Sequence, residues 1–278
     1  MRITRQPRYI IGLLISIIQL ACVSCTPAWI KYDQVAKDLQ LSRTVITTTY
    51  FNIAVYKNQQ VGSAKRLHIY LDGDGSPWKS NGLLINEDPT PRRYLVLQLM
   101  SLDSSPAVLI GRPCYHGFNR DSYCHPLLWT HARYSEKVVS AISDALQTIL
   151  KENNVSEVTL IGYSGGGTLA QLLAAKIQKT RAIVTLAGNF DLVAWAQLHE
   201  YSPLEGSLNP AERLPLPAHI LQIHYVGSAD DNIPPSLTEH YLSRKGMGEI
   251  QVLKGVDHYN GWLARWPEIM LNLKKRLL

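Results

Sequence analysis

The sequence predicts an α/β protein whose mostly parallel sheet is covered by helices on both faces. Short apolar runs alternate along the chain with segments that repeat apolar residues at three- and four-residue steps. The apolar runs are nearly continuous, as in parallel strands that are buried on both faces. The 278 residues, 46% of them hydrophobic and 18% charged, are enough for one such core and exclude a disordered or coiled-coil protein.

Residues 1–25 have the pattern of an export signal. Arg2, Arg5 and Arg8 precede an almost wholly apolar run from Ile10 to Ala21, and a basic segment before a short apolar one is typical of exported proteins. The run is too short to span a bilayer comfortably. We therefore expect the protein in the periplasm or at the envelope membrane of a Gram-negative-like bacterium.

The stretch "QLACVSCTP" resembles the end of a bacterial lipoprotein signal, in which a cysteine after a small residue receives a lipid. Cys22, which follows Ala21, fits this pattern better than Cys25, which follows Ser24. A lipid on Cys22 would hold the protein at a membrane face. Neither cysteine has the usual aliphatic residue three positions earlier, so ordinary secretion stays open as an alternative.

The formal net charge of +6 does not indicate a nucleic-acid partner. Three of the positive charges belong to the arginines of the signal, and the rest are spread along the chain. No basic stripe with interleaved aromatic residues is present, so we expect no nucleic acid to bind.

Two further cysteines, Cys114 and Cys124, lie in the segment "GRPCYHGFNRDSYCHP". In an exported protein such a pair is typical of a disulfide that closes a loop, whereas a cytosolic chain would hold two buried free thiols. The export signal favours the disulfide.

The expected domain spans residues 26–278. It begins with a helix or an irregular lead-in at residues 29–41. Residues 43–58 are rich in β-branched and aromatic residues, which favours one long strand or a hairpin. An apolar strand at residues 65–75 ends in a glycine-rich turn. Residues 92–103 have helical periodicity, and a short apolar strand follows them at 106–113.

The middle of the chain predicts a helix, a strand and a second helix. Residues 135–154 repeat apolar residues at helical spacing, with Ser135 as the N-cap. An apolar strand follows at residues 155–164. Residues 166–179 contain mostly helix-forming residues.

The last part of the chain predicts strands at residues 181–191, 218–230 and 249–258, followed by a helix at 266–277 with Pro267 in its first turn. Between the first two of these strands the alternation breaks. The intervening residues 192–217 hold several prolines and glycines, which predicts a small insertion or cap.

The stretch "VTLIGYSGGGTLAQLLAAKI" places Ser164 between a predicted strand and a predicted helix. Gly162 and Gly166 complete the pattern Gly-x-Ser-x-Gly, which lifts a serine hydroxyl out of a sheet on a sharp turn that needs small neighbours. A phosphate-binding turn is disfavoured, because no lysine follows the glycines and the turn comes too late for a dinucleotide fingerprint.

A serine becomes a nucleophile when a base takes its proton and a carboxylate orients that base. His258 follows the last predicted strand, and Asp230 and Asp231 follow the strand before it. Ser164 and these residues each come at the carboxyl end of a strand, which is the edge where active sites of parallel sheets lie. Asp191, one strand earlier, is a third candidate for the acid.

With these motifs the chain after the signal resembles the α/β-hydrolase superfamily. The segment "GSADDNIP" is similar to a pattern that many members have around the acid, which implies Asp230 first, Asp231 second and Asp191 last. The segments "LDGDGSPW" and "LEGSLNP" and the two-cysteine loop also resemble a group of exported proteobacterial α/β-hydrolases.

The resemblance implies an oxyanion hole made of two backbone N–H groups. One belongs to Gly165, and the other comes in the superfamily from the loop after an early strand, often within a His-Gly sequence. Asp72 and Gly73 stand in that place here, so the N–H of Asp74 is the expected second donor. We expect the side chains of Asp72 and Asp74 to bind loop backbone, because a carboxylate that faced the oxyanion would oppose its charge.

These residues predict a serine hydrolase that cleaves carboxylic esters or thioesters of small acyl compounds through an acyl-enzyme, without a metal or organic cofactor. Ser164 is the nucleophile, His258 the base and Asp230 the acid. An acyltransferase would use the same residues, and a non-catalytic binding protein of the envelope would use only the fold. Four tryptophans are candidates for the walls of an acyl pocket: Trp78, Trp129, Trp195 and Trp262.

Overall fold

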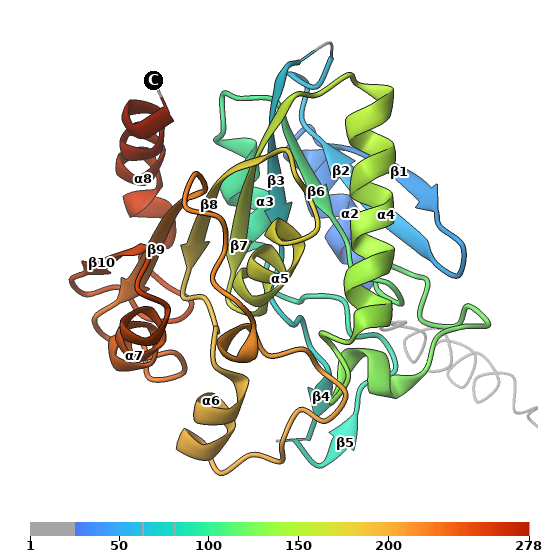
Figure 1. The fold of residues 1–278 in the computed structure, drawn as a ribbon. Coiled ribbons are helices and arrows are strands. Elements are labelled where there is room, and N and C mark those ends of the chain that lie inside the picture. Colours follow the sequence, from blue (N-terminus) through green and yellow to red (C-terminus); the bar gives the residue numbers. More distant parts are fainter. Residues whose placement is uncertain (1–25, 63, 81, 278) are drawn as a thin grey trace, which may run out of the picture.

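A computed structural model describes residues 26–62, 64–80 and 82–277. The predicted export signal and the predicted lipid site at Cys22 lie outside the described residues. Within them, eight strands form a sheet in the order β1-β2-β6-β3-β7-β8-β9-β10 (Figure 1). These strands are β1 (Ser42–Thr47), β2 (Asn52–Lys57), β3 (Arg66–Leu71), β6 (Ala107–Ile110), β7 (Glu157–Tyr163), β8 (Thr180–Leu186), β9 (Leu221–Gly227) and β10 (Glu249–Leu253).

The sheet is mostly parallel, as predicted. All neighbouring strands from β6 to β10 are parallel, whereas β1 pairs antiparallel with β2, and β2 pairs antiparallel with β6. Residues 43–58 therefore form a hairpin and not one long strand. The parallel order brings the carboxyl ends of β3, β7, β9 and β10 to one edge of the sheet, where residues from distant parts of the chain meet.

Helices cover both faces of the sheet (Figure 1). They are α2 (Ala28–Asp38), α3 (Leu95–Ser101), α4 (Glu136–Glu152), α5 (Gly165–Ala174), α6 (Leu192–Leu198), α7 (Pro235–Lys245) and α8 (Trp262–Leu277). Successive strand residues point to opposite faces. In β2, Ile53 and Val55 pack in the core that includes α4 and α5, whereas Ala54 and Tyr56 pack in the core that includes α2, α3 and α8.

The sequence predicts the first residue of helix α4 correctly but not that of helix α8. Ser135 caps α4 as predicted, and its hydroxyl accepts a hydrogen bond from the backbone N–H of Val138. Helix α8, in contrast, begins at Trp262 and not at Trp266. Both tryptophans are buried on one side of the helix, and burial of the first extends the helix by one turn. Pro267 therefore lies inside the helix and not in its first turn.

Helix α7 and the small hairpin of β4 (Trp78–Lys79) and β5 (Leu84–Ile85) have no counterpart among the predicted elements. Helix α7 packs against β9 and β10 but buries few apolar side chains, mainly Tyr241, so it lacks the apolar stripe that identifies a helix. Residues 192–217, the predicted insertion, contain α6 and the short 3-10 helix η2 (Pro210–Glu212). None of the helices in the described part of the chain is long and apolar enough to cross a membrane.

The structure joins Cys114 and Cys124 by a disulfide, as the sequence predicts. Cys114 is fully buried and lies between Arg112 and Tyr115 in the segment after β6. The hydroxyl of Tyr115 donates a hydrogen bond to the backbone oxygen of Asp74 at 2.9 Å. The disulfide thus stabilises a segment that packs against the loop after β3.

Replacing Cys114 and Cys124 together by alanine is expected to lower the free energy of unfolding by about 2–3 kcal/mol. The reason is that the bond restricts the unfolded chain by closing a loop of sequence separation 10. Urea unfolding of the parent and the double variant at the same pH measures the difference. Equal stabilities would contradict a stabilising role for the bond.

Candidate active site

Ser164 lies on the sharp turn between β7 and α5. Its backbone has φ of 52° and ψ of −120°, a strained conformation for a residue with a side chain. Three backbone hydrogen bonds hold the turn. The N–H of Ser164 donates to the oxygen of Leu186 at 2.9 Å, and its own oxygen accepts from the N–H groups of Gly167 at 2.8 Å and Asn189 at 3.3 Å. The hydroxyl is thereby held at the carboxyl edge of the sheet.

The glycines that flank the serine are required by close contacts. A Cβ atom on Gly166 would lie 2.0 Å from the backbone oxygen of Leu71, and one on Gly162 would lie 2.3 Å from the oxygen of Gly166. On Gly165 it would lie 2.0 Å from Oδ1 of Asp74. Helix α5 therefore approaches the end of β3 only where side chains are absent, and this explains the small residues of the Gly-x-Ser-x-Gly pattern.

His258 and Asp230 meet Ser164 at this edge. The hydroxyl of Ser164 lies 3.1 Å from Nε2 of His258, and Nδ1 of His258 lies 2.9 Å from Oδ2 of Asp230. Asp230 is only 3% exposed and His258 only 5%. When Nδ1 donates its proton to the carboxylate, Nε2 is left to accept the serine proton. The structure thus brings together three residues that the sequence places after three different strands.

The other two candidate acids do not contact His258. Asp231 is exposed. Asp191 is buried, caps α6 with its side chain and forms an ion pair with Arg244 at 3.2 Å. Of the three candidates, Asp230 alone has the position of an acid that orients the histidine.

Asn232 belongs to this site, although no sequence motif identifies it. Its backbone N–H donates to Oδ1 of Asp230 at 2.9 Å, and its side-chain nitrogen lies 3.1 Å from Nε2 of His258. The indole N–H of Trp195 donates to Oδ1 of Asn232 at 3.2 Å. Because an indole can only donate, this contact directs the side-chain NH2 group toward His258. Trp195 of helix α6 is therefore linked to His258 through the side chain of Asn232.

Two aromatic side chains hold the backbone of His258. The hydroxyl of Tyr163 donates to the carbonyl oxygen of His258 at 2.7 Å, and the indole N–H of Trp262 donates to the same oxygen at 3.1 Å. Trp262 is fully buried. These contacts fix the loop after β10 against β7 and α8, and with it the position of the imidazole.

The loop after β3 lies beside the serine turn. Gly165 and Asp74 both line the cavity at the serine. In the part of the chain that the structure describes, neither backbone N–H has a hydrogen-bond acceptor. These two N–H groups are the expected oxyanion donors, and both remain available to a bound molecule.

The side chain of Asp74 does not bind loop backbone, contrary to expectation. Its Oδ1 accepts hydrogen bonds from Arg112 at 2.9 Å and from the hydroxyl of Tyr134, and its Oδ2 accepts from Arg133 at 2.8 Å. Burial raises the pKa of this carboxyl, but the charges of Arg133 and Arg112 outweigh burial and hold the pKa below its ordinary value. Two buried guanidinium groups need an anion, and Asp74 supplies it.

The side chain of Asp72 binds its own loop, as expected. Its Oδ1 accepts from the backbone N–H of Gly73 at 2.7 Å, and its Oδ2 accepts from the hydroxyl of Tyr32 at 2.8 Å. Burial raises the pKa of Asp72 to about 6. Both carboxylates of the loop are thus directed at protein donors.

A cavity of about 420 Å³ opens at the serine, and a second of about 510 Å³ adjoins it. The side chains of Arg133 and Trp195 line both cavities. Of the four candidate tryptophans, Trp78 and Trp195 line the second cavity. Trp129 and Trp262 are buried in the core and line neither.

The chain has the α/β-hydrolase fold, as comparison with solved structures shows. It is similar to an alpha-beta serine hydrolase homologue from Coxiella burnetii, with 14% identity and a TM-score of 0.55 over 85% of this chain and 97% of that one. An esterase from Pyrococcus furiosus matches with 12% identity and a TM-score of 0.59 over 86% and 93% of the two chains. A membrane phospholipase A, described as a novel bacterial virulence factor, matches with 13% identity and a TM-score of 0.59 over 98% of both chains. No protein-family model matches the sequence, and no curated protein matches it.

Substituting Gly166 by alanine is expected to lower the free energy of unfolding by at least about 2 kcal/mol, because the new Cβ would collide with the backbone of Leu71. Gly62→Ala is the matched control, since among the described residues no atom beyond its own chain neighbours lies within 4 Å of its Cβ position. We expect the control to change stability by less than about 0.5 kcal/mol. Denaturant unfolding compares the two variants, and equal effects would contradict close packing at the turn.

Asp72→Asn is expected to change how stability depends on pH. Because the pKa of Asp72 is raised from 3.8 to about 6 in the folded protein, its contribution is favourable below about pH 4 and is lost as pH rises through about 6. We predict that the stability of the parent relative to the variant falls by about 2 kcal/mol between pH 4 and pH 7. Urea unfolding at both pH values measures this, and a constant difference would contradict the raised pKa.

Proposed function

We propose that the protein is a serine hydrolase that cleaves carboxylic esters or thioesters through an acyl-enzyme. The observation that carries this proposal is the continuous contact from Ser164 to His258 to Asp230 on a strained turn at the edge of the sheet. Some of the solved structures with the same fold are named as an esterase, a serine hydrolase homologue and a phospholipase. Their names support the reaction class and leave the substrate open.

In the proposed mechanism the hydroxyl of Ser164 attacks the carbonyl carbon of the substrate. Nε2 of His258 takes the serine proton, and Asp230 stabilises the resulting imidazolium. The histidine then gives this proton to the leaving oxygen or sulfur, which leaves an acyl group on Ser164. A water molecule attacks the acyl-enzyme with His258 again as the base, and the acid and the free serine are released.

Backbone N–H groups of Gly165 and Asp74 are proposed to bind the oxyanion that forms during both steps. Both line the cavity at Ser164, and Gly165 begins α5, whose N-terminus favours negative charge. Loss of one such donor typically costs about 100- to 1000-fold in rate. Arg112 and Arg133 hold the side chain of Asp74, which keeps its loop in place beside the serine turn.

The two adjoining cavities suit a small ester with an apolar part. A ligand site of this kind commonly has a volume of several hundred Å³ and combines apolar walls with a few polar groups. Trp78, Trp195 and Tyr201 line the second cavity, and we propose that they contact the apolar part of the substrate.

We also propose that the protein is exported and that Cys22 carries a lipid. The basic and apolar pattern of residues 1–25 supports export. The disulfide between Cys114 and Cys124 is consistent with an oxidising compartment.

Asp230→Asn is expected to lower kcat for p-nitrophenyl esters by about 10,000-fold, because an amide would hold the wrong tautomer of His258. Asp231→Asn is the matched control, since this neighbour is exposed and does not contact the histidine. We expect the control to keep the parent rate within about twofold.

Steady-state kinetics on purified parent, Asp230→Asn, Asp231→Asn and Ser164→Ala test the proposal. Turnover that persists in Ser164→Ala would exclude Ser164 as the nucleophile. A large loss in Asp231→Asn with none in Asp230→Asn would instead reassign the acid.

A further inference from the structure

Two arginines at the cavity beside the serine form no hydrogen bond or ion pair with other described residues. Arg92 and Arg93 both line this cavity. In the part of the chain that the structure describes, neither guanidinium forms a hydrogen bond or an ion pair, although Arg93 lies over an aromatic ring. Arg133, a third cation of this cavity, is in contrast paired with Asp74 at 2.8 Å. The first two arginines therefore keep their N–H donors free.

The carboxylates of the same site are all directed at other protein donors. Asp74 is bound by two arginines and a tyrosine, and Asp72 by a tyrosine hydroxyl and a backbone N–H. Asp230 is bound by His258 and by two backbone N–H groups. None of these acids pairs with Arg92 or with its neighbour. The charge that a bound molecule meets in this cavity is therefore positive.

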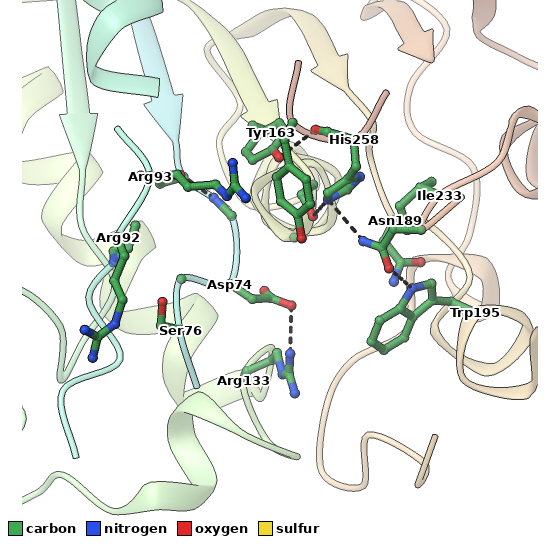
Figure 2. A pocket seen from close by; sticks show the side chains of 18 residues that line it. Asp74, Ser76, Arg92, Arg93, Arg133, Tyr163, Asn189, Trp195, Ile233 and His258 are labelled. Carbon is green, nitrogen blue, oxygen red and sulfur yellow. Dashed lines mark hydrogen bonds and ion pairs between the residues drawn. The ribbon is translucent and has the colours of Figure 1, made fainter. Parts of the chain in front are cut away.

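Of the two arginines, Arg93 is better placed to bind an anionic group of a molecule at Ser164. Its guanidinium carbon lies 4.1 Å from the centroid of the Tyr259 ring, and Tyr259 directly follows His258. Figure 2 shows its guanidinium directed toward Tyr163, whereas that of Arg92 points away from the histidine. A guanidinium that stacks on a ring face keeps the N–H groups at its edge available to an anion.

We propose that the substrate is an anionic ester, whose carboxylate or phosphate group binds Arg93 while its ester carbonyl lies at Ser164. This inference rests on the proposed function of Ser164. The planar guanidinium matches both kinds of anion, because two of its N–H groups can bind two oxygens of either group. A charge-assisted contact at a partly exposed site is expected to raise kcat/KM by about tenfold.

Three pairs of esters test the proposal on the full chain, and each pair compares an anionic ester with a neutral analogue. Each enzymatic rate is divided by the rate of uncatalysed hydrolysis of the same ester, which corrects for differences in intrinsic reactivity. For a carboxylate on the leaving group, 4-acetoxybenzoate is compared with 4-acetoxybenzamide. For a phosphate on the leaving group, 4-acetoxyphenyl phosphate is compared with its dimethyl ester. For a carboxylate on the acyl group, p-nitrophenyl hydrogen glutarate is compared with its methyl ester. The three pairs separate a carboxylate from a phosphate and one side of the ester from the other.

We expect kcat/KM for the charged member of at least one pair to exceed that of the neutral member by about tenfold. The ratio should fall as NaCl is added, because salt screens exposed charges. Arg93→Gln should bring the ratio close to one, and Arg93→Lys should keep part of it. Arg181→Gln is the matched control, because Arg181 is exposed near the start of β8, at the opposite edge of the sheet, and it should leave the ratio unchanged.

The ratio of kcat/KM for the charged ester to kcat/KM for its neutral partner does not depend on how much of the protein sample is folded. Equal rates within every pair, or a preference for the charged ester that survives Arg93→Gln, would overturn this inference and leave the proposed function standing. No turnover of any of the six esters above that of Ser164→Ala would overturn the proposed function itself, and this inference with it.

Discussion

Backbone packing between the start of α5 and the end of β3 is the constraint on which the candidate site depends. A side chain on Gly166 would lie 2.0 Å from the backbone oxygen of Leu71, so the helix reaches this position only without one. The same close approach holds Ser164 at a φ of 52° and brings the N–H of Gly165 beside the loop that carries Asp74. One packing contact thus positions both the candidate nucleophile and the candidate oxyanion donors.

The charges around this turn have two different roles. Arg112 and Arg133 are buried, and Asp74 neutralises them, so this cluster holds the loop after β3 in place. Arg93 is exposed, unpaired among the described residues and stacked on Tyr259. Buried charges that are paired are costly to separate and so keep their segments together, whereas a cation left without a partner in a cavity is available to a ligand. The proposed preference for anionic esters follows from this division.

The parts of the fold and site that depend on local patterns could be predicted from the sequence. Apolar runs predict the parallel sheet; Ser164 directly follows β7, and His258 lies in the loop after β10. Helix α7 could not be predicted, because it buries too few apolar residues to form a stripe. Asn232, in the loop after β9, and Trp195, in α6, are brought together by the tertiary fold, which no local sequence pattern indicates. The contacts of the Asp74 side chain could not be predicted for the same reason, since its partners come from segments distant in the chain.

Labelling with a fluorophosphonate tests the central claim most directly, because this probe reacts with a serine whose proton a neighbouring base can accept. We predict that the purified parent takes up the probe on Ser164, identified by mass spectrometry of the labelled peptide. Ser164→Ala and His258→Ala should take up none. A folded, disulfide-bonded parent that remains unlabelled would contradict an activated serine and would favour a binding protein on an α/β-hydrolase fold.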